Sequence, residues 1–305
     1  MSELNDIDLM NLRKRWYSEP MTLLEMVKCM NGREVAFLEG KTKLPLLTKN
    51  ALEIRGIKAH SLSYLQNNFE NFKFTERPCN LYTSIAKFEN LPMFSYNFER
   101  RKEERAAFTQ GEGFNQCFKG WDFVIDLDSQ RIKDGGVITE LNAFEVNEKI
   151  KDYYNIAGMY SDAKKLKKIF DEYGLAYSVK ASGLKGMHFQ VKDENFFPKD
   201  MEPKDKVDLA DVIVTNLKEL ENIPTIDNIN FYDSTRILKC PYSLEGYHVA
   251  LPLSEGNGFG SFNDWKIEDM RLDKIYQNIR IVNRGLLERP KTRDPQEFID
   301  FYRDF

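Results

Sequence analysis

The chain has 305 residues, of which 42% are hydrophobic and 30% are charged, and its formal net charge is −4. This composition is typical of a soluble globular protein that forms one large domain or two smaller ones. The negative net charge excludes a general attraction for nucleic acid, so any such binding must use local basic patches. No apolar run approaches the roughly 20 residues of a membrane helix, and the polar start is not a signal peptide. We therefore expect a cytoplasmic protein without membrane contacts.

The cysteines are scattered and include no Cys-x-x-Cys pair; they are Cys29, Cys79, Cys117 and Cys240. This spacing argues against a zinc site and agrees with a reducing compartment. We therefore expect no zinc in the protein.

Helices and strands alternate along the chain. The patterns predict two helices within 8–30, a strand at 33–38, a helix at 61–71, and strands at 81–88 and 121–128. They then predict a helix at 162–173 capped by Ser161 and closed by Gly174, strands at 177–181 and 188–191, and a helix at 203–222. Short extended pieces follow over 224–253, and one or two helices over 262–305. This mixture predicts an α+β (mixed α/β) fold without a sharp internal boundary.

The strand predicted at 121–128 carries the first chemical signal. Its side chains alternate between faces, so Asp126 and Asp128 project on one side, about 7 Å apart at Cα. Buried, unpaired carboxylates are costly, and bound Mg²⁺ or Mn²⁺ would offset that cost, with substrate phosphates completing the coordination. The alternative is that the strand ends there and the two residues begin a solvated turn. A calcium loop is excluded because Arg131 and Val137 occupy the positions that need Gly and Glu.

The second signal is the turn Ser182-Gly183-Leu184-Lys185-Gly186-Met187-His188 between two predicted strands. Glycines let the backbone approach a ligand and turn its N–H groups toward an anion. Lys185 adds a point charge and His188 a directional donor, so the turn is a candidate triphosphate cradle. The alternative is an ordinary glycine-rich hairpin turn, since the segment does not match a P-loop.

The third signal is Asp227, followed by a segment that contains Arg236 and Lys239. Asp233 or Ser234 is a candidate cap for a single helical turn, on which Arg236 and Lys239 would share a side. Asp227 ends the segment Thr-Ile-Asp, which is typical of a strand edge, and Asp233 is its competitor as a metal ligand.

Two segments are rich in basic residues: Arg100-Arg101-Lys102 with Arg105, and the run from Lys164 to Lys168. Acidic residues flank the first segment, so we interpret it as a solvated helix face, with a template-binding patch as the alternative. The second segment is most simply an exposed helix face.

In series, the three stretches resemble the three motifs of the archaeo-eukaryotic primase superfamily. The pattern is hydrophobic-Asp-hydrophobic-Asp, then Ser-Gly-x-x-Gly-x-His, then an Asp followed by a basic segment that ends in x-Pro-x-Ser-Leu. The third stretch is more similar to the archaeal primase small (catalytic) subunit than to the repair-polymerase branch. The segments RKRWY, REVAF and LYTSIAKF also resemble that subunit, and the resemblance covers roughly 10–255.

The resemblance implies the archaeo-eukaryotic primase fold, in which an N-terminal α/β unit faces an RRM-like unit across a catalytic cleft. The catalytic domain would span 1–260, followed by a C-terminal helical extension at 261–305. Three catalytic residues would bind two Mg²⁺ or Mn²⁺ ions: Asp126, Asp128 and Asp227. The implied nucleotide-binding residues are Ser182, Gly183, Lys185, Gly186, His188, Arg236 and Lys239.

The implied activity is a template-dependent nucleotidyltransferase that makes primers on single-stranded DNA from NTPs or dNTPs. A primase large subunit and a replicative helicase are the candidate protein partners. Two alternatives stay open: a repair- or defence-associated polymerase that extends ends without starting chains, and a nucleic-acid-binding subunit with little catalysis.

The sequence departs from the family pattern at three points. Leu184 stands where eukaryotic relatives carry a second arginine, so one phosphate contact is missing. Glu245 stands where a histidine is usual, with His248 nearby. The cysteine-rich zinc insertion between the first two motifs is absent, which indicates a compact or diverged member.

Overall fold

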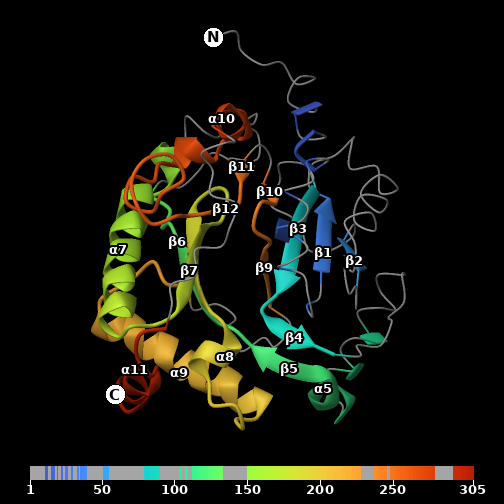
Figure 1. Cartoon of the computed structure of the whole chain (residues 1–305), viewed down its shortest axis with the longest axis vertical. Coiled ribbons are helices and arrows are strands. Elements are labelled where there is room, and N and C mark those ends of the chain that lie inside the picture. Colours follow the sequence, from blue (N-terminus) through green and yellow to red (C-terminus); the bar gives the residue numbers. More distant parts are fainter. Residues whose placement is uncertain are drawn as a thin grey trace.

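The computed structural model describes residues 79–89, 112–132, 150–227, 236–245, 248–278 and 291–305. It also describes strands at 35–39 and 51–54, and single positions between 11 and 33 and between 103 and 108. Figure 1 shows two antiparallel sheets side by side, with helices packed on the outer face of one of them. The predicted mixed α+β fold is confirmed. The predicted helix at 61–71 and the basic residues at 100–102 and 105 lie outside the described residues.

The first sheet has the strand order β2-β1-β3-β9, and all its pairs are antiparallel. Its strands are β1 (Val35–Glu39), β2 (Ala51–Ile54), β3 (Cys79–Ser84) and β9 (Ile237–Lys239). The helical turn predicted to carry Arg236 and Lys239 is wrong, because this segment pairs with β3 as a strand. Arg236 lies just before this strand, and Lys239 is its last residue.

A two-stranded ribbon carries the chain from the first sheet to the second. After Ile85, β4 (Ala86–Phe88) pairs with β5 (Phe118–Trp121), and the short helix α5 (Glu112–Cys117) precedes β5. The strand predicted at 81–88 is therefore broken at Ile85, and the one predicted at 121–128 begins only after Asp122.

The second sheet has the order β12-β7-β8-β6, again antiparallel. Its strands are β6 (Phe123–Asp128), β7 (Tyr177–Ala181), β8 (Gly186–Val191) and β12 (Leu251–Pro252). Asp126 lies opposite His188, which lies opposite Lys180, so this row of side chains shares one face of the sheet. The odd-numbered residues of β6 form the other face, as predicted from the alternation.

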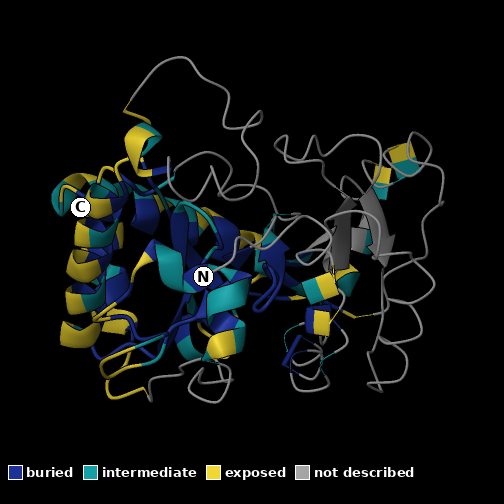
Figure 2. Ribbon diagram, turned by 90° about the horizontal axis from the view of Figure 1, so that it is seen from above, coloured by how far each residue is buried: buried dark blue, intermediate teal, exposed yellow. Residues whose placement is uncertain are grey.

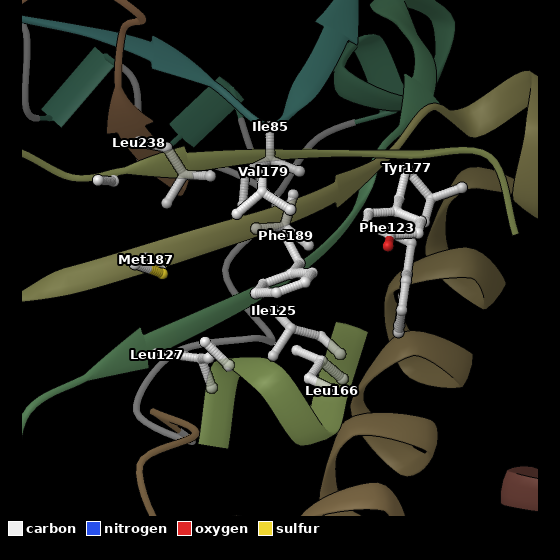
Figure 3. Packing of buried hydrophobic residues seen from close by; sticks show 14 of the residues in the cluster. Ile85, Phe123, Ile125, Leu127, Leu166, Tyr177, Val179, Met187, Phe189 and Leu238 are labelled. Atoms are coloured by element: carbon white, nitrogen blue, oxygen red, sulfur yellow. The ribbon is translucent and has the colours of Figure 1, made fainter. Parts of the chain in front are cut away.

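Helix α7 (Ile156–Glu172) covers that apolar face, and Figure 3 shows Leu166 beside Ile125 and Leu127. The helix begins earlier than the predicted cap at Ser161, because the Asn155 side chain accepts a hydrogen bond from the backbone N–H of Gly158 at 2.9 Å. Ser161 is therefore inside the helix. Gly174 follows its end with φ +65°, as predicted for a left-handed closing residue.

The remaining helices pack around the same core. They are α8 (Asp193–Phe196), α9 (Pro203–Leu220), η2 (Ile267–Met270), α10 (Leu272–Gln277) and α11 (Gln296–Arg303), and the ribbon β10 (Leu244–Glu245) with β11 (His248–Val249) lies beside them. Helix α11 places Phe298 against the rings of Phe123 and Phe170, at centroid distances of 6.2 and 5.7 Å. The segment after 260 thus shares the core with β6, and the domain boundary stays a prediction. Figure 2 shows the second sheet mostly buried and the outer helix faces exposed.

In the parts of the chain that the structure describes, none of the helices combines the length and the apolar character needed to cross a membrane.

Candidate active site

The three predicted acidic residues lie on two neighbouring backbone segments. The segment 225–227 runs antiparallel to the end of β6, where Ile226 lies opposite Leu127. The backbone N–H of Asp227 donates to the Asp126 carbonyl, and that of Asp128 donates to the Thr225 carbonyl, each at 2.9 Å. The predicted strand edge is confirmed, and this pairing brings Asp227 to the end of β6, where Asp126 and Asp128 lie.

Arg236 bridges two of these carboxylates. Its Nη2 lies 2.9 Å from Asp126 Oδ2 and 3.6 Å from Asp227 Oδ2. The Asp126 side chain is only 14% exposed. Burial and the neighbouring Asp128 carboxylate raise the pKa of Asp126 from 3.8 to about 6, although Arg236 acts in the opposite direction. The guanidinium therefore offsets only part of the negative charge.

Lys185 pairs with the third carboxylate. Its Nζ lies 2.7 Å from Asp128 Oδ2. Burial opposes its charge, but the Asp128 carboxylate raises the pKa of Lys185 overall. The turn that carries Lys185 is closed by a hydrogen bond from the Ser182 N–H to the Gly186 carbonyl at 2.8 Å, and Gly183 adopts φ +108°, a conformation that favours glycine. The predicted hairpin therefore brings Lys185 to the acidic residues.

His188 is buried beside Asp126, with its Nε2 3.3 Å from Asp126 Oδ1. Burial and the cations Lys180, Arg236 and Lys239 lower the pKa of His188 well below 6.5, so the ring is neutral at pH 7. Within the described residues, neither His188 Nδ1 nor Asp126 Oδ1 has a hydrogen-bond partner. Two buried polar atoms in this state, on neighbouring side chains, indicate a place for a polar ligand.

Lys239 is buried on β9, and its ammonium contacts Glu245 and lies 5.6 Å from the centre of the Tyr82 ring. Burial and the neighbouring Lys180 lower the pKa of Lys239. Glu245 thus occupies the environment where the resemblance expects a histidine. His248 lies directly opposite Glu245 in the β10–β11 ribbon and is buried, which lowers the pKa of His248 to about 3. Asp233 lies outside the described residues.

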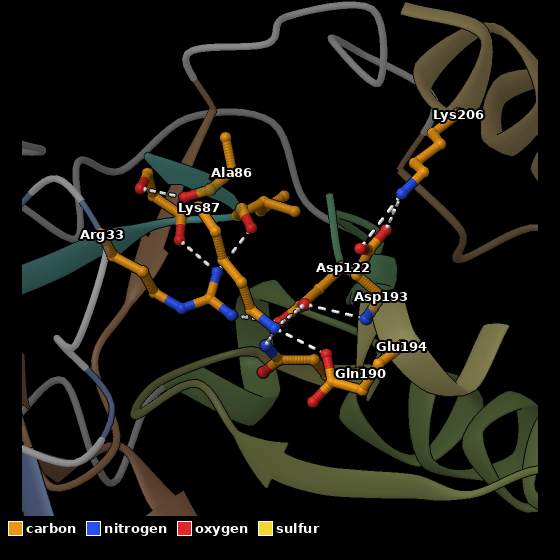
Figure 4. Close-up of polar contacts among 10 residues, drawn as sticks. Arg33, Ala86, Lys87, Asp122, Gln190, Asp193, Glu194 and Lys206 are labelled. Atoms are coloured by element: carbon orange, nitrogen blue, oxygen red, sulfur yellow. Dashed lines mark hydrogen bonds and ion pairs between the residues drawn. The ribbon is translucent and has the colours of Figure 1, made fainter. Parts of the chain in front are cut away.

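Sequence reasoning missed the buried carboxylate of Asp122, which stands between β5 and β6 (Figure 4). Its oxygens accept hydrogen bonds from Arg33, from Gln190 Nε2 at 2.6 Å and from the Asp193 N–H at 3.1 Å, and Lys87 Nζ lies 3.5 Å away. Burial opposes ionisation, but Arg33 and Lys87 keep the pKa of Asp122 below 3.8. The signal available in sequence was a charged residue between the apolar residues Trp121 and Phe123.

The acidic residues fit a divalent cation that a substrate helps to coordinate. Among the described residues, no three acidic, histidine or cysteine side chains converge closely enough to hold a metal alone. Mg²⁺ does not require such a set, because one or two carboxylates and substrate phosphates commonly hold it. The buried Asp126 Oδ1 has no hydrogen-bond partner in the described part, and the repulsion from Asp128 and Asp227 favours a cation there.

Comparison with known proteins adds little to this geometry. No family model matches the chain, and no curated protein matches its sequence. Among solved structures, the chain is similar to the polymerase domain of ligase D from Mycobacterium tuberculosis, which was determined in complex with DNA. The two share 13% sequence identity with a TM-score of 0.47, and the match covers 89% of this chain and 88% of that one. This similarity is too low to transfer a function, so the function rests on the site itself.

The free energy of unfolding of the metal-free protein should fall as the pH rises from about 4 to about 6, because the Asp126 carboxyl group loses its proton in this range. The folded chain retains a proton up to about pH 6 that the unfolded chain releases near 3.8, so the contribution is complete below pH 4 and is lost as the pH rises through 6. A shift of about two pKa units corresponds to about 3 kcal/mol. Urea denaturation in EDTA should show Asp126→Asn gaining stability relative to the wild type between pH 4.5 and 7. A difference that does not change with pH would contradict this, and added Mg²⁺ should reduce it.

Gly186→Ala should displace the end of β6. A Cβ at this position would lie 2.6 Å from the Leu127 carbonyl oxygen and 2.7 Å from Asp128 Oδ1, so backbone atoms must move. We expect about 1–3 kcal/mol of lost stability, measured by urea denaturation. Gly113→Ala is the matched control, because its Cβ would meet only the Phe108 ring at 3.4 Å. Equal stability of the two variants would show that the Gly186 contact is not tight.

Proposed function

We propose that the chain is a metal-dependent nucleotidyltransferase that copies a single-stranded DNA template and makes primers from NTPs or dNTPs. The observation that supports this most is the alignment of Asp126, Asp128 and Asp227 beside the basic side chains of Lys185 and Lys239. Carboxylates bind cations, and ammonium groups bind phosphates. A site that contains both matches the requirements of nucleotidyl transfer from a nucleoside triphosphate.

Asp126, Asp128 and Asp227 would hold Mg²⁺ or Mn²⁺, and the bound ions would supply Lewis-acid activation of a 3′-hydroxyl and offset charge on the leaving oxygen. The hydrogen bond from the Asp227 backbone N–H to the Asp126 carbonyl fixes these two residues relative to each other. In the chain alone, Arg236 offsets the charge of Asp126 and Asp227. We assign Arg236 a further contact with the nucleotide phosphates.

Lys185 and Lys239 would bind the phosphates, because Lys185 pairs with Asp128 and Lys239 interacts electrostatically with Asp126 and Asp128. The neutral ring of His188 would donate one hydrogen bond to a phosphate oxygen. Ser182, Gly183 and Gly186 form the turn that sets the position of Lys185, and the two glycines allow the backbone to approach the ligand. Together these groups would hold the triphosphate in line with the attacking hydroxyl.

The test is to incubate the purified chain with a single-stranded DNA template, labelled NTPs or dNTPs, and Mn²⁺ or Mg²⁺. The proposal predicts labelled products without an added primer. Products only from an annealed primer would identify an end-extending polymerase, and no incorporation with intact DNA binding would identify a binding subunit. A chain in which Asp126 and Asp227 are both replaced by asparagine gives the background for every condition. Adding a candidate large subunit or helicase would show whether initiation depends on a partner.

A further inference from the structure

Lys180 is a buried cation at the centre of the site that the sequence motifs do not include. It lies on β7 opposite His188, which is itself opposite Asp126, so Lys180 belongs to the row of side chains that faces the acidic cluster. Only 5% of Lys180 is exposed. Its Nζ donates a hydrogen bond to the backbone carbonyl of Lys239, which links β7 of the second sheet to β9 of the first.

The surroundings of Lys180 do not supply a paired counter-charge. In the described part of the chain, no carboxylate forms an ion pair with its ammonium. The charged and titratable groups around it are Asp126, Arg33, Cys29, Cys240, His188 and Lys239, and burial lowers the pKa of Lys180 to about 8. A buried ammonium without a paired carboxylate is costly. An apolar residue of similar length would fill the same space without that cost.

The buried Lys180 ammonium donates its hydrogen bond to one specific residue. The carbonyl that Lys180 holds belongs to Lys239, whose side chain is a proposed phosphate ligand. Because β9 is a short strand of three residues, the position of this carbonyl also fixes where the Lys239 side chain starts. The same hydrogen bond therefore positions Lys239, which lies in the first sheet, relative to His188 and Asp126, which lie in the second sheet.

We propose that Lys180 is a positioning residue of the nucleotide site, which acts by holding the Lys239 backbone so that the Lys239 ammonium meets the triphosphate. This inference rests on the proposed function, since it needs Lys239 to bind phosphate. The competing role is a purely structural link between the two sheets. In that case the loss of Lys180 would change the stability of the protein, but the molecules that stay folded would bind phosphate with unchanged affinity.

A double-mutant cycle separates these roles. Lys180→Met, Lys239→Met and the double variant are compared for binding of inorganic triphosphate with Mg²⁺ by calorimetry, which avoids any preference for base or sugar. Each single substitution should raise Kd by about 10-fold, the loss expected when one hydrogen bond to a charged group is removed. In the Lys239→Met background, adding Lys180→Met should change Kd less than about 2-fold, because Lys180 acts through Lys239.

Lys206→Met is the matched control, since Lys206 is also buried but pairs with Asp193 at 2.8 Å on a different part of the molecule. It should lower the melting temperature and leave the triphosphate Kd unchanged. If Lys180→Met does not fold, Lys180→Leu, which is smaller and also lacks a hydrogen-bond donor to the Lys239 carbonyl, provides the same cycle.

Two results would overturn the inference: an unchanged Kd in Lys180→Met, or effects of the two substitutions that multiply independently. Failure of the proposed function has a different signature, because Lys239→Met would then bind triphosphate as tightly as the wild type.

Discussion

Asp227→Asn should lower the rate of nucleotide transfer by about 1,000-fold or more and leave the melting temperature unchanged. The loss of a metal-binding carboxylate removes several kcal/mol of transition-state stabilisation, and about 4 kcal/mol corresponds to this factor. The fold should survive, because the backbone N–H of Asp227 still donates to the Asp126 carbonyl and asparagine has nearly the same shape. Single-turnover incorporation of labelled nucleotide measures the rate, and calorimetry measures the melting temperature.

Asp233→Asn is the matched control for this result. Asp233 is the acidic residue that competes with Asp227 in sequence, and asparagine has nearly the same shape as aspartate. The control variant should keep wild-type activity. If the two phenotypes were exchanged, with Asp227→Asn active and Asp233→Asn inactive, the assignment of the third carboxylate would be wrong.

Asp122→Ala should cause the largest loss of stability of any single substitution proposed for this chain, about 3–5 kcal/mol. Removing one partner of a buried ion pair leaves the other charge uncompensated. Here Arg33 would remain buried at 9% side-chain exposure, and the side chain of Gln190 and the N–H of Asp193 would lose their acceptor. Urea denaturation at pH 7 measures the change in unfolding free energy.

Asp273→Ala is the comparison for this prediction. Asp273 also pairs with an arginine, Arg271 at 2.9 Å, but both side chains are partly exposed, so its loss should cost less than about 1 kcal/mol. A similar, small effect of both substitutions would show that the Asp122 network does not hold the ribbon β4–β5 to the second sheet.

The part of the site that follows from local periodicity could be predicted from the sequence. Two carboxylates separated by one residue in a strand must share a face, and Asp126 and Asp128 do. The turn between β7 and β8 was also readable, because glycines at 183 and 186 and the flanking β-formers are local signals. The strand edge at Asp227 was predicted from three residues, and pairing with β6 bears it out.

The part that depends on distant partners could not be predicted. The segment at 237–239 has a local pattern compatible with a helical turn, and only its pairing with β3, far away in the sequence, makes it a strand. The start of α7 was misplaced because serine is a common cap, whereas the Asn155 side chain takes this role by bonding to Gly158. Lys180 is a single charge in a strand and Asp122 lies between two strands, and the partners of both come from other parts of the chain.

Binding of Mn²⁺ measured by electron paramagnetic resonance tests the central claim most directly, because it reports on the carboxylates without requiring a template or turnover. The wild-type chain should bind Mn²⁺ more tightly when a non-hydrolysable nucleoside triphosphate is present, since the phosphates complete the coordination. Asp126→Asn and Asp227→Asn should each lose this nucleotide-dependent binding, while Asp273→Asn retains it. Equal Mn²⁺ binding by all four proteins would contradict the assignment of Asp126 and Asp227 as metal ligands, and with it the proposed function.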